Sequence, residues 1–292
     1  MIEYKLDVLM ITYNHQDYIK EAINGVINQK TRFKYRLLIF DDCSTDKTEE
    51  RIRECLNHSN SNLTILYHRN SVNLGMIANG KQSFEAIKST YVALCEGDDY
   101  WIDFYKLQKQ IDFLEENIDY SMCFHNATES MNGKLKKMTF CQHINKQTLS
   151  LEDFMFRHIV PTASIVFRNN LEFPEWSKNV HSGDKLIILL NAIKGKIMYF
   201  DEIMCHYNVT DNGVSRSIEH RGLNKVYNMS YLYSKLDEYT NFKYKEILKR
   251  GLNYEINVHL LEPYRKELKT SLLIKEIFIR ILIKWFKYKR KS

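Results

Sequence analysis

The chain has 292 residues with 44% hydrophobic content, enough for one large α/β domain with an appendage, so a disordered or fibrous protein is excluded. The net charge of +6 is uneven, because the segment from Arg265 to Ser292 holds ten Lys or Arg and two Glu. The rest of the chain is therefore slightly acidic, and we expect no nucleic-acid partner.

The cysteine pattern indicates a reduced, cytoplasmic protein. The six cysteines include no CxxC pair, so neither a disulfide framework nor a zinc ribbon is predicted. Asp7 interrupts the apolar run near the N-terminus, which argues against a signal peptide. The cysteines are Cys43, Cys55, Cys95, Cys123, Cys141 and Cys205.

Four predicted strands recur at regular intervals in the first half of the chain. They begin near Leu6, Tyr35, Leu63 and Tyr91, which are 29, 28 and 28 residues apart. This is the size of a strand-helix-strand unit. The intervening apolar residues, such as those from Ile19 to Ile27, repeat with helical period. The fold class is therefore α/β, with a mostly parallel twisted sheet flanked by helices.

Polar groups follow three of these strands. They are Tyr13-Asn14, Asp41-Asp42 and the stretch "EGDD", residues 96 to 99. The carboxyl ends of parallel strands meet at one edge, where ligands bind, so we expect these groups to lie close together. Clustered carboxylates there are typical of a divalent cation site for Mg²⁺ or Mn²⁺. Each stretch alone is equally typical of a turn or a helix cap, for which Ser44, Thr45 and Asp46 are candidates.

The second half changes character near Asp119. A hairpin turn is predicted at Asn132-Gly133, followed by a short helix over 150–158 and a strand over 162–169. A helix from Asp184 to Lys194, closed by Gly195, precedes a strand over 196–201.

We expect a domain over 1–215, with a nucleotide-binding half (1–118) and an acceptor-binding half (119–215). A helical C-terminal extension follows over 216–292.

Four stretches in order and spacing resemble the family 2 glycosyltransferases, which have the A-type nucleotide-diphospho-sugar transferase fold. They are "VLMITYNHQDYIKEAINGVINQ", "LLIFDDCSTDKT", "NSVNLGMIANG" and "YVALCEGDDYWID", and the resemblance spans residues 6 to about 215. It implies an inverting enzyme that moves one sugar from a nucleotide sugar, a UDP-sugar, to a glycan or lipid-linked glycan in surface polysaccharide biosynthesis.

The resemblance also implies residue roles. Tyr13 would stack on the base, and Asp42 would accept a hydrogen bond from a ring nitrogen of the base. Asp98 would contact the ribose, and Asp99 would ligate the divalent cation, Mn²⁺ or Mg²⁺, with indirect help from Glu96. The remaining residues expected to contact the nucleotide are Thr12, Asn14, Asn73, Gly75 and Asn79. Gly75 is equally typical of the start of a helix.

Sugar transfer also needs a base, because an acceptor hydroxyl is too weakly acidic to ionise alone. Gly183-Asp184 opens an amphipathic helix and matches the element that carries the family's base, so Asp184 is the predicted catalytic residue. A helix cap would explain Asp184 as well.

One departure concerns the end of the last strand. Relatives often read Tyr-Arg-x-His where this chain has Tyr207-Asn208-Val209-Thr210, so the usual histidine is absent at Thr210. His206 or Asp211 are candidates to substitute for it.

Several other residues have more than one interpretation. His181, Thr162 and Ser164 are candidates for acceptor contacts, although local structural roles are the favoured explanation for all three. Tyr100 and Trp101 suit sugar stacking, but core packing explains both.

The C-terminal segment 272–292 carries basic and aromatic residues but no uninterrupted 18-residue apolar span. Such a helix suits an anionic membrane surface, or else packs on the domain or on a second copy in a homodimer.

Two other functions stay open from sequence. A sugar nucleotidyltransferase also uses a parallel sheet and paired carboxylates, but "ITYNHQDY" lacks the expected Gly-rich basic loop. An inactive nucleotide-sugar-binding module is the other alternative.

Overall fold

The computed structural model describes residues 3–57, 61–131, 134–156, 158–209 and 222–262. Contacts divide the chain into two units, Met1–Gly213 and Val214–Ser292, and each is described by itself. The assignment of nucleotide-binding and acceptor-binding halves stays a prediction.

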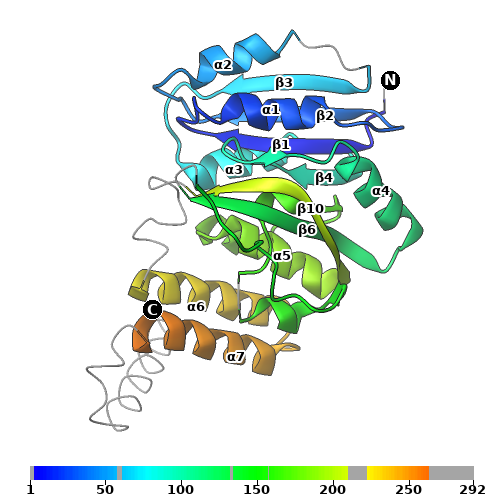
Figure 1. Ribbon diagram of the computed structural model, residues 1–292. Helices are drawn as coiled ribbons and strands as arrows, with labels where there is room; N and C mark the ends of the chain where they lie inside the picture. The colour runs from blue at the N-terminus through cyan, green and yellow to red at the C-terminus, as the bar shows by residue number, and fades with distance from the viewer. Residues whose placement is uncertain (1–2, 58–60, 132–133, 157, 210–221, 263–292) are drawn as a thin grey trace. The chain divides into compact units, whose positions relative to one another are not determined.

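One mixed sheet organises the first unit (Figure 1). Its order is β3-β2-β1-β4-β9-β6-β10-β5, with β7 paired to β6 and β8 paired to β10. β3, β2, β1 and β4 are mutually parallel, and β9 runs against β4 and β6. The strands are β1 Leu6–Thr12, β2 Tyr35–Asp41, β3 Leu63–Arg69, β4 Tyr91–Leu94, β5 Tyr100–Trp101, β6 Tyr120–Met131, β7 Lys134–Leu135, β8 Thr148–Leu149, β9 Val166–Arg168 and β10 Lys196–Val209.

Helices flank this sheet, as predicted. Those of the first unit are α1 Ile19–Ile27, α2 Thr48–Cys55, α3 Met76–Glu85, α4 Lys106–Glu116 and α5 Gly183–Lys194, with short 3₁₀ helices η1 Leu151–Phe154, η2 Thr162–Ser164 and η3 Glu175–Asn179. The predicted fold class is confirmed. The four predicted strand starts coincide with those of β1 to β4, because each begins a run of residues that suits a sheet covered on both faces.

The two faces of β1 have different environments. Leu6, Val8 and Met10 belong to the main apolar core, together with the buried face of α1. Asp7 points to the other face, where its carboxylate binds Arg36 at 2.7 and 2.6 Å and accepts the N–H groups of Lys88 and Ser89. This satisfied ion pair anchors the segment that leads into β4.

The acceptor half differs from prediction in two places. The expected short helix over 150–158 is a single 3₁₀ turn, Leu151–Phe154. The expected strand over 162–169 begins only at Val166, because Thr162–Ser164 form a 3₁₀ turn after Pro161. Proline favours such a turn, since it fixes φ at the turn's entrance.

The β6 hairpin pairs Ser130 with Leu135 and Met131 with Lys134, as the turn prediction requires. The Asn132-Gly133 turn itself lies outside the described residues. Helix α5 ends at Lys194, and β10 runs eight residues beyond its predicted end at Asp201.

The second unit contains α6 Gly222–Tyr239, α7 Lys245–Ile256 and a π-helical turn, η6 Asn257–Leu261. Val226 and Ile256 form a small buried cluster within it. Among the described helices, none is long and apolar enough to cross a membrane. The segment 272–292 lies outside the described residues.

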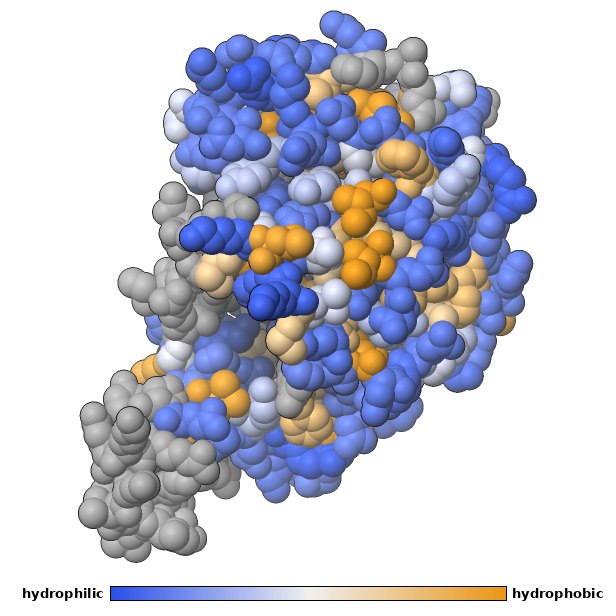
Figure 2. Space-filling view, viewed as in Figure 1, coloured by the Kyte–Doolittle hydropathy of each residue, from blue (hydrophilic) through white to orange (hydrophobic). Residues whose placement is uncertain are grey.

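The surface is largely hydrophilic on the face shown in Figure 2, with small, separate apolar areas. All six cysteines are free thiols, and only Cys43 is not buried.

Candidate active site

Three strand ends meet at one edge of the sheet. The N–H of Asp42, just after β2, donates to the carbonyl of Thr12 at the end of β1 at 2.9 Å. The N–H of Gly97, just after β4, donates to the carbonyl of Ile11 at 3.1 Å. The turns after β1, β2 and β4 are therefore neighbours, and the predicted convergence of their polar groups is confirmed.

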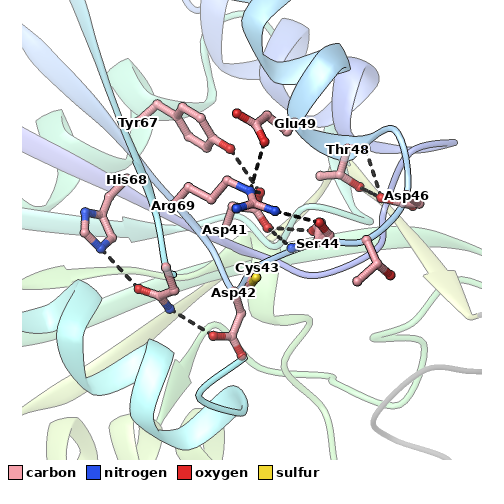
Figure 3. A network of polar contacts seen from close by, with 12 residues as sticks. Asp41, Asp42, Cys43, Ser44, Asp46, Thr48, Glu49, Tyr67, His68 and Arg69 are labelled. Carbon is pink, nitrogen blue, oxygen red and sulfur yellow. Dashed lines mark hydrogen bonds and ion pairs between the residues drawn. The ribbon is translucent and has the colours of Figure 1, made fainter. Parts of the chain in front are cut away.

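Asp41 and Asp42 point in different directions (Figure 3). Asp41 is buried and accepts bonds from the N–H and hydroxyl of Ser44 and from the hydroxyl of Tyr67. Arg69 lies 3.5 Å from Asp41 and 3.0 Å from Glu49. Asp41 thus fixes the turn after β2, and its role is structural.

Asp42 faces the start of α3. Its Oδ1 accepts the side-chain amide of Asn70 at 2.9 Å and the N–H of Leu74 at 2.8 Å, and its Oδ2 accepts the N–H of Gly75 at 2.8 Å. Two carboxylate oxygens offer about four acceptor positions, so one position on Oδ2 stays available for a ligand.

The 73–79 segment is built around that carboxylate. Gly75 caps α3 with φ +82, a backbone conformation that favours glycine, and its N–H also meets the Asn73 side chain. Asn79 is buried and bonds Asn70 and the carbonyl of Phe40. Asn79 therefore supports Asp42 from within the fold.

The turn after β1 presents one exposed ring. Tyr13 is 42% exposed, which leaves its ring accessible for stacking. Asn14 has φ 56, and its side chain accepts the N–H of Thr45 at 2.8 Å, while its own N–H donates to Ser44. Asn14 therefore joins the turns after β1 and β2.

The three capping candidates before α2, Ser44, Thr45 and Asp46, make different contacts. Asp46 accepts the N–H and hydroxyl of Thr48 at the start of α2. Ser44 is instead bound to Asp41, and Thr45 to Asn14, so the prediction that Ser44 and Thr45 cap this helix was wrong.

The turn after β4 gathers three carboxylates. Glu96, Asp98 and Asp99 have oxygen atoms that all lie within 4.8 Å of one another. Asp99 is 1% exposed, and its Oδ1 accepts the N–H of Asn208 at 2.8 Å, whereas its Oδ2 is buried with no hydrogen-bond partner among the described residues.

The carboxylates of this cluster affect one another's pKa values. Burial, followed by the charges of Asp98 and Asp184, raises the pKa of Glu96 to about 8. Burial, followed by Asp98 and Glu96, raises the pKa of Asp99 well above its ordinary value. A buried oxygen without a partner inside such a cluster fits a divalent cation, since hard oxygen ligands suit Mg²⁺ or Mn²⁺.

Asp184 lies at the same site. It stands in the first turn of α5, its side chain is about one-third exposed, and its charge contributes to the raised pKa of Glu96. Its Oδ2 is 4.0 Å from Nδ1 of His158. The N-cap residue of α5 is Ser182, so Asp184 is not the cap, although an acidic residue in the first turn also suits the helix N-terminus.

Several residues were missed or given another role from sequence. Asn208, in the stretch noted as a departure, also donates its side-chain amide to the carbonyl of Asp98 at 2.7 Å. His206 is buried, and its Nδ1 meets the hydroxyl of Thr128 at 2.8 Å. Because its side chain is buried, His206 contributes to the packing of β10. Thr210 and Asp211 lie outside the described residues.

The other candidate contacts are mostly internal. Ser164 is buried and donates to the carbonyl of Pro161 at 2.6 Å. The indole N–H of buried Trp101 donates to the carbonyl of Ala163 at 2.7 Å, so Trp101 packs in the core. Tyr100 packs against the ring of His206, with ring centres 5.0 Å apart.

Comparison with known proteins gives a family that fits this arrangement of carboxylates at the edge of the sheet. A model of glycosyl transferase family 2 matches residues 7–172, more than half of the chain. The chain belongs to glycosyl transferase family 2.

Relatives support the same family. An uncharacterized Mycobacterium tuberculosis protein is 32% identical over 212 residues, which are 73% of this chain and 61% of that protein. This chain thus spans less than two thirds of that relative's length. A Bacillus subtilis protein, TuaG, named as a teichuronic acid biosynthesis glycosyltransferase, is 22% identical over 72% of this chain and 81% of its own.

Two solved structures share the fold. S. aureus TarS in complex with UDP-GlcNAc has a TM-score of 0.69 at 17% identity, covering 93% of this chain and 77% of that chain. A mannosyltransferase from Pyrobaculum calidifontis, in complex with GDP-Man and Mn²⁺, has a TM-score of 0.63 at 15% identity, covering 96% and 80%.

Proposed function

We propose that this protein transfers one sugar from a nucleotide sugar, a UDP-sugar, to a glycan acceptor with inversion, in surface polysaccharide biosynthesis. The observation that carries the proposal is the placement of Asp42, the Glu96-Asp98-Asp99 cluster and Asp184 at one edge of the sheet. Family membership supports the reaction class, and TuaG supports the glycan context.

In this proposal the base of the donor lies between Tyr13 and Asp42. The exposed Tyr13 ring offers stacking worth about 1–3 kcal/mol. The remaining acceptor position on Asp42 Oδ2 suits a base that presents a ring N–H, as uracil and guanine do. Asn73, Gly75 and Asn79 hold the segment beside that position, and Thr12 and Asn14 hold the turn that carries Tyr13.

The diphosphate end of the donor lies at the acidic cluster. Asp98 is the proposed ribose contact, and Asp99, through its unpartnered oxygen, is the proposed cation ligand, with Glu96 close to both. A bound Mn²⁺ or Mg²⁺ would neutralise the charge that develops on the departing nucleoside diphosphate.

Asp184 is the proposed general base. As the acceptor oxygen bonds to the anomeric carbon, the bond from that carbon to the phosphate oxygen breaks on the opposite face, and the hydroxyl proton passes to the Asp184 carboxylate. Asp184 lies in the first turn of α5, where a carboxylate interacts favourably with the N-terminal end of the helix dipole.

The domain roles follow from this arrangement. Residues 1–118 would bind the donor and 119–215 the acceptor, a glycan or lipid-linked glycan. The 272–292 segment would hold the protein at the inner membrane surface, with a homodimer as the other role for the same segment. The segment 272–292, to which both roles are assigned, lies outside the described residues.

Release of UDP from UDP-sugars in the presence of Mn²⁺ and a glycan acceptor tests the proposal. The wild-type protein should release UDP, and Asp184→Asn should bind UDP with unchanged affinity while transfer falls by two to four orders of magnitude, about the worth of general-base catalysis. Equal release by both proteins would contradict the role of Asp184. Binding of UDP without release by the wild type would favour an inactive binding module.

The inverting outcome needs its own measurement. The anomeric configuration of the product linkage, read from NMR coupling constants, should be opposite to that of the donor. Retention would rule out single displacement by Asp184.

A further inference from the structure

His15 lies in a loop, but its backbone is held by hydrogen bonds to two helices. Its N–H donates to the hydroxyl of Thr48 at 2.8 Å, and its carbonyl accepts the N–H groups of Tyr18 and Ile19 at the start of α1. The backbone on both sides of His15 is therefore fixed by α1 and α2.

The imidazole ring is fixed as well. Nδ1 lies 3.2 Å from the hydroxyl of Thr12, and a Cβ at Gly97 would come within 2.9 Å of that same nitrogen. The ring thus packs directly on the backbone of the acidic turn. Such close contact requires glycine at position 97, which links the placement of His15 to the turn that carries the carboxylates.

Nε2 faces the donor site. It lies 3.9 Å from Oδ2 of Asp98, too far for a direct hydrogen bond, and the side chain is about one-quarter exposed. Either the Thr12 hydroxyl or Nδ1 can be the donor in that contact, and when the hydroxyl donates, the ring carries its proton on Nε2. In that tautomer the N–H lies near the carboxylate of Asp98.

The position of His15 along the site indicates what that N–H meets. Tyr13, which we assign to the base, lies two residues before His15 in the turn after β1, and Asp98, assigned to the ribose, has its Oδ2 3.9 Å from Nε2 of His15. A nucleoside diphosphate that spans these two regions passes His15. Because the surrounding carboxylates repel phosphate, a nearby N–H donor is what an anionic diphosphate needs there.

We propose that His15 binds the diphosphate of the donor by donating Nε2–H to a phosphate oxygen. This inference rests on the proposed function. His15 is assigned to phosphate because an imidazole N–H is a hydrogen-bond donor, whereas Mg²⁺ and Mn²⁺ suit the carboxylate oxygens of the Glu96-Asp98-Asp99 cluster.

Calorimetric titration with UDP and with uridine, both with Mn²⁺ present, tests the inference. His15→Ala should weaken UDP binding about tenfold or more, the worth of a hydrogen bond to a charged group, and leave uridine binding unchanged. Mn²⁺ binding without nucleotide should also be unchanged. His143→Ala, at an exposed histidine in another segment, is the matched control and should bind both ligands as the wild type does.

Each other result overturns the inference. Unchanged UDP affinity would show that the N–H does not reach phosphate. Equal weakening of UDP and uridine would mean that the ring only supports the turn, and loss of Mn²⁺ affinity would make it a cation ligand. A wild-type protein that binds no nucleoside diphosphate would overturn the proposed function itself, whereas tight UDP binding by both wild type and His15→Ala overturns the role of His15 alone.

Discussion

At Gly97, the close packing of Thr12 and His15 is directly linked to the position of the acidic turn. A Cβ at this position would lie 2.6 Å from Oγ1 and 2.8 Å from Cβ of Thr12, and 2.9 Å from Nδ1 of His15. Non-bonded heavy atoms normally sit about 3.5–4.0 Å apart, so Gly97→Ala must move these groups by roughly 0.6–0.9 Å. Thr12 ends a buried strand and has little room to move.

Overpacking of this kind costs about 1–3 kcal/mol, which lowers the melting temperature of a unit of this size by roughly 2–12 °C. The displacement also moves the turn that carries Asp98 and Asp99. Because a misplacement of about 1 Å can reduce a rate by about 10²-fold, we expect sugar transfer to fall by up to about that factor.

Thermal denaturation and UDP release measure the two effects, with Gly80→Ala as the matched control. Gly80 lies inside α3, and nothing lies within 4 Å of a Cβ added there. That variant should gain about 0.5–1 kcal/mol, as expected for alanine within a helix. If Gly97→Ala melts and turns over like Gly80→Ala, the close packing of the three turns is not what positions the site.

Further predictions concern the acidic turn and the core. In metal-free protein, the pKa of Glu96 is raised to about 8. The contribution of the Glu96 side chain to the free energy of unfolding is therefore fully present below pH 4.5 and is progressively lost as the pH rises toward 8. Thermal melts across this window should show Glu96→Gln losing a slope of up to about 1.4 kcal/mol per pH unit, and an unchanged slope would contradict the raised pKa. Asn208→Ala removes the bond to the Asp98 carbonyl and should weaken Mn²⁺ affinity several-fold, since one hydrogen bond is worth about 1 kcal/mol; unaltered titration curves would argue against this support. Asp7→Ala leaves Arg36 buried without its partner and should cost about 3–5 kcal/mol in urea denaturation, whereas Asp119→Ala, at an exposed ion pair, should leave stability unchanged; similar losses in both would refute this distinction.

Residues 1–118 could be predicted closely from sequence because their signals are local. Each strand is a short segment rich in apolar residues that starts after a loop, and the carboxylates lie at or a few residues beyond the ends of β2 and β4. Leu6 and Tyr91 therefore mark true strand starts. The convergence of Thr12, Asp42 and Gly97 then follows from parallel topology alone.

Residues 119–209 were predicted less well because their structure depends on partners far away in sequence. Thr162–Ser164 look like a strand in isolation, yet Pro161 and the buried contact of Trp101 with Ala163 favour a 3₁₀ turn. Asn208 carries no sequence signal for its role, since its contacts with Asp98 and Asp99 span more than 100 residues.

The difference between Asp41 and Asp42 could not be read from composition. Both follow the same strand, but alternation along the chain turns one toward Arg69 and the other toward α3 (Figure 3). Only the resemblance distinguished the role of Asp42 from that of Asp41. The contacts in the structure give the physical reason for the difference.

The mutual bonds among Asn14, Ser44 and Thr45 join the turns after β1 and β2. A turn that is already ordered loses little conformational entropy when a ligand binds beside it. With the donor bound as proposed, ordering of this turn should therefore add little to the free-energy cost of binding.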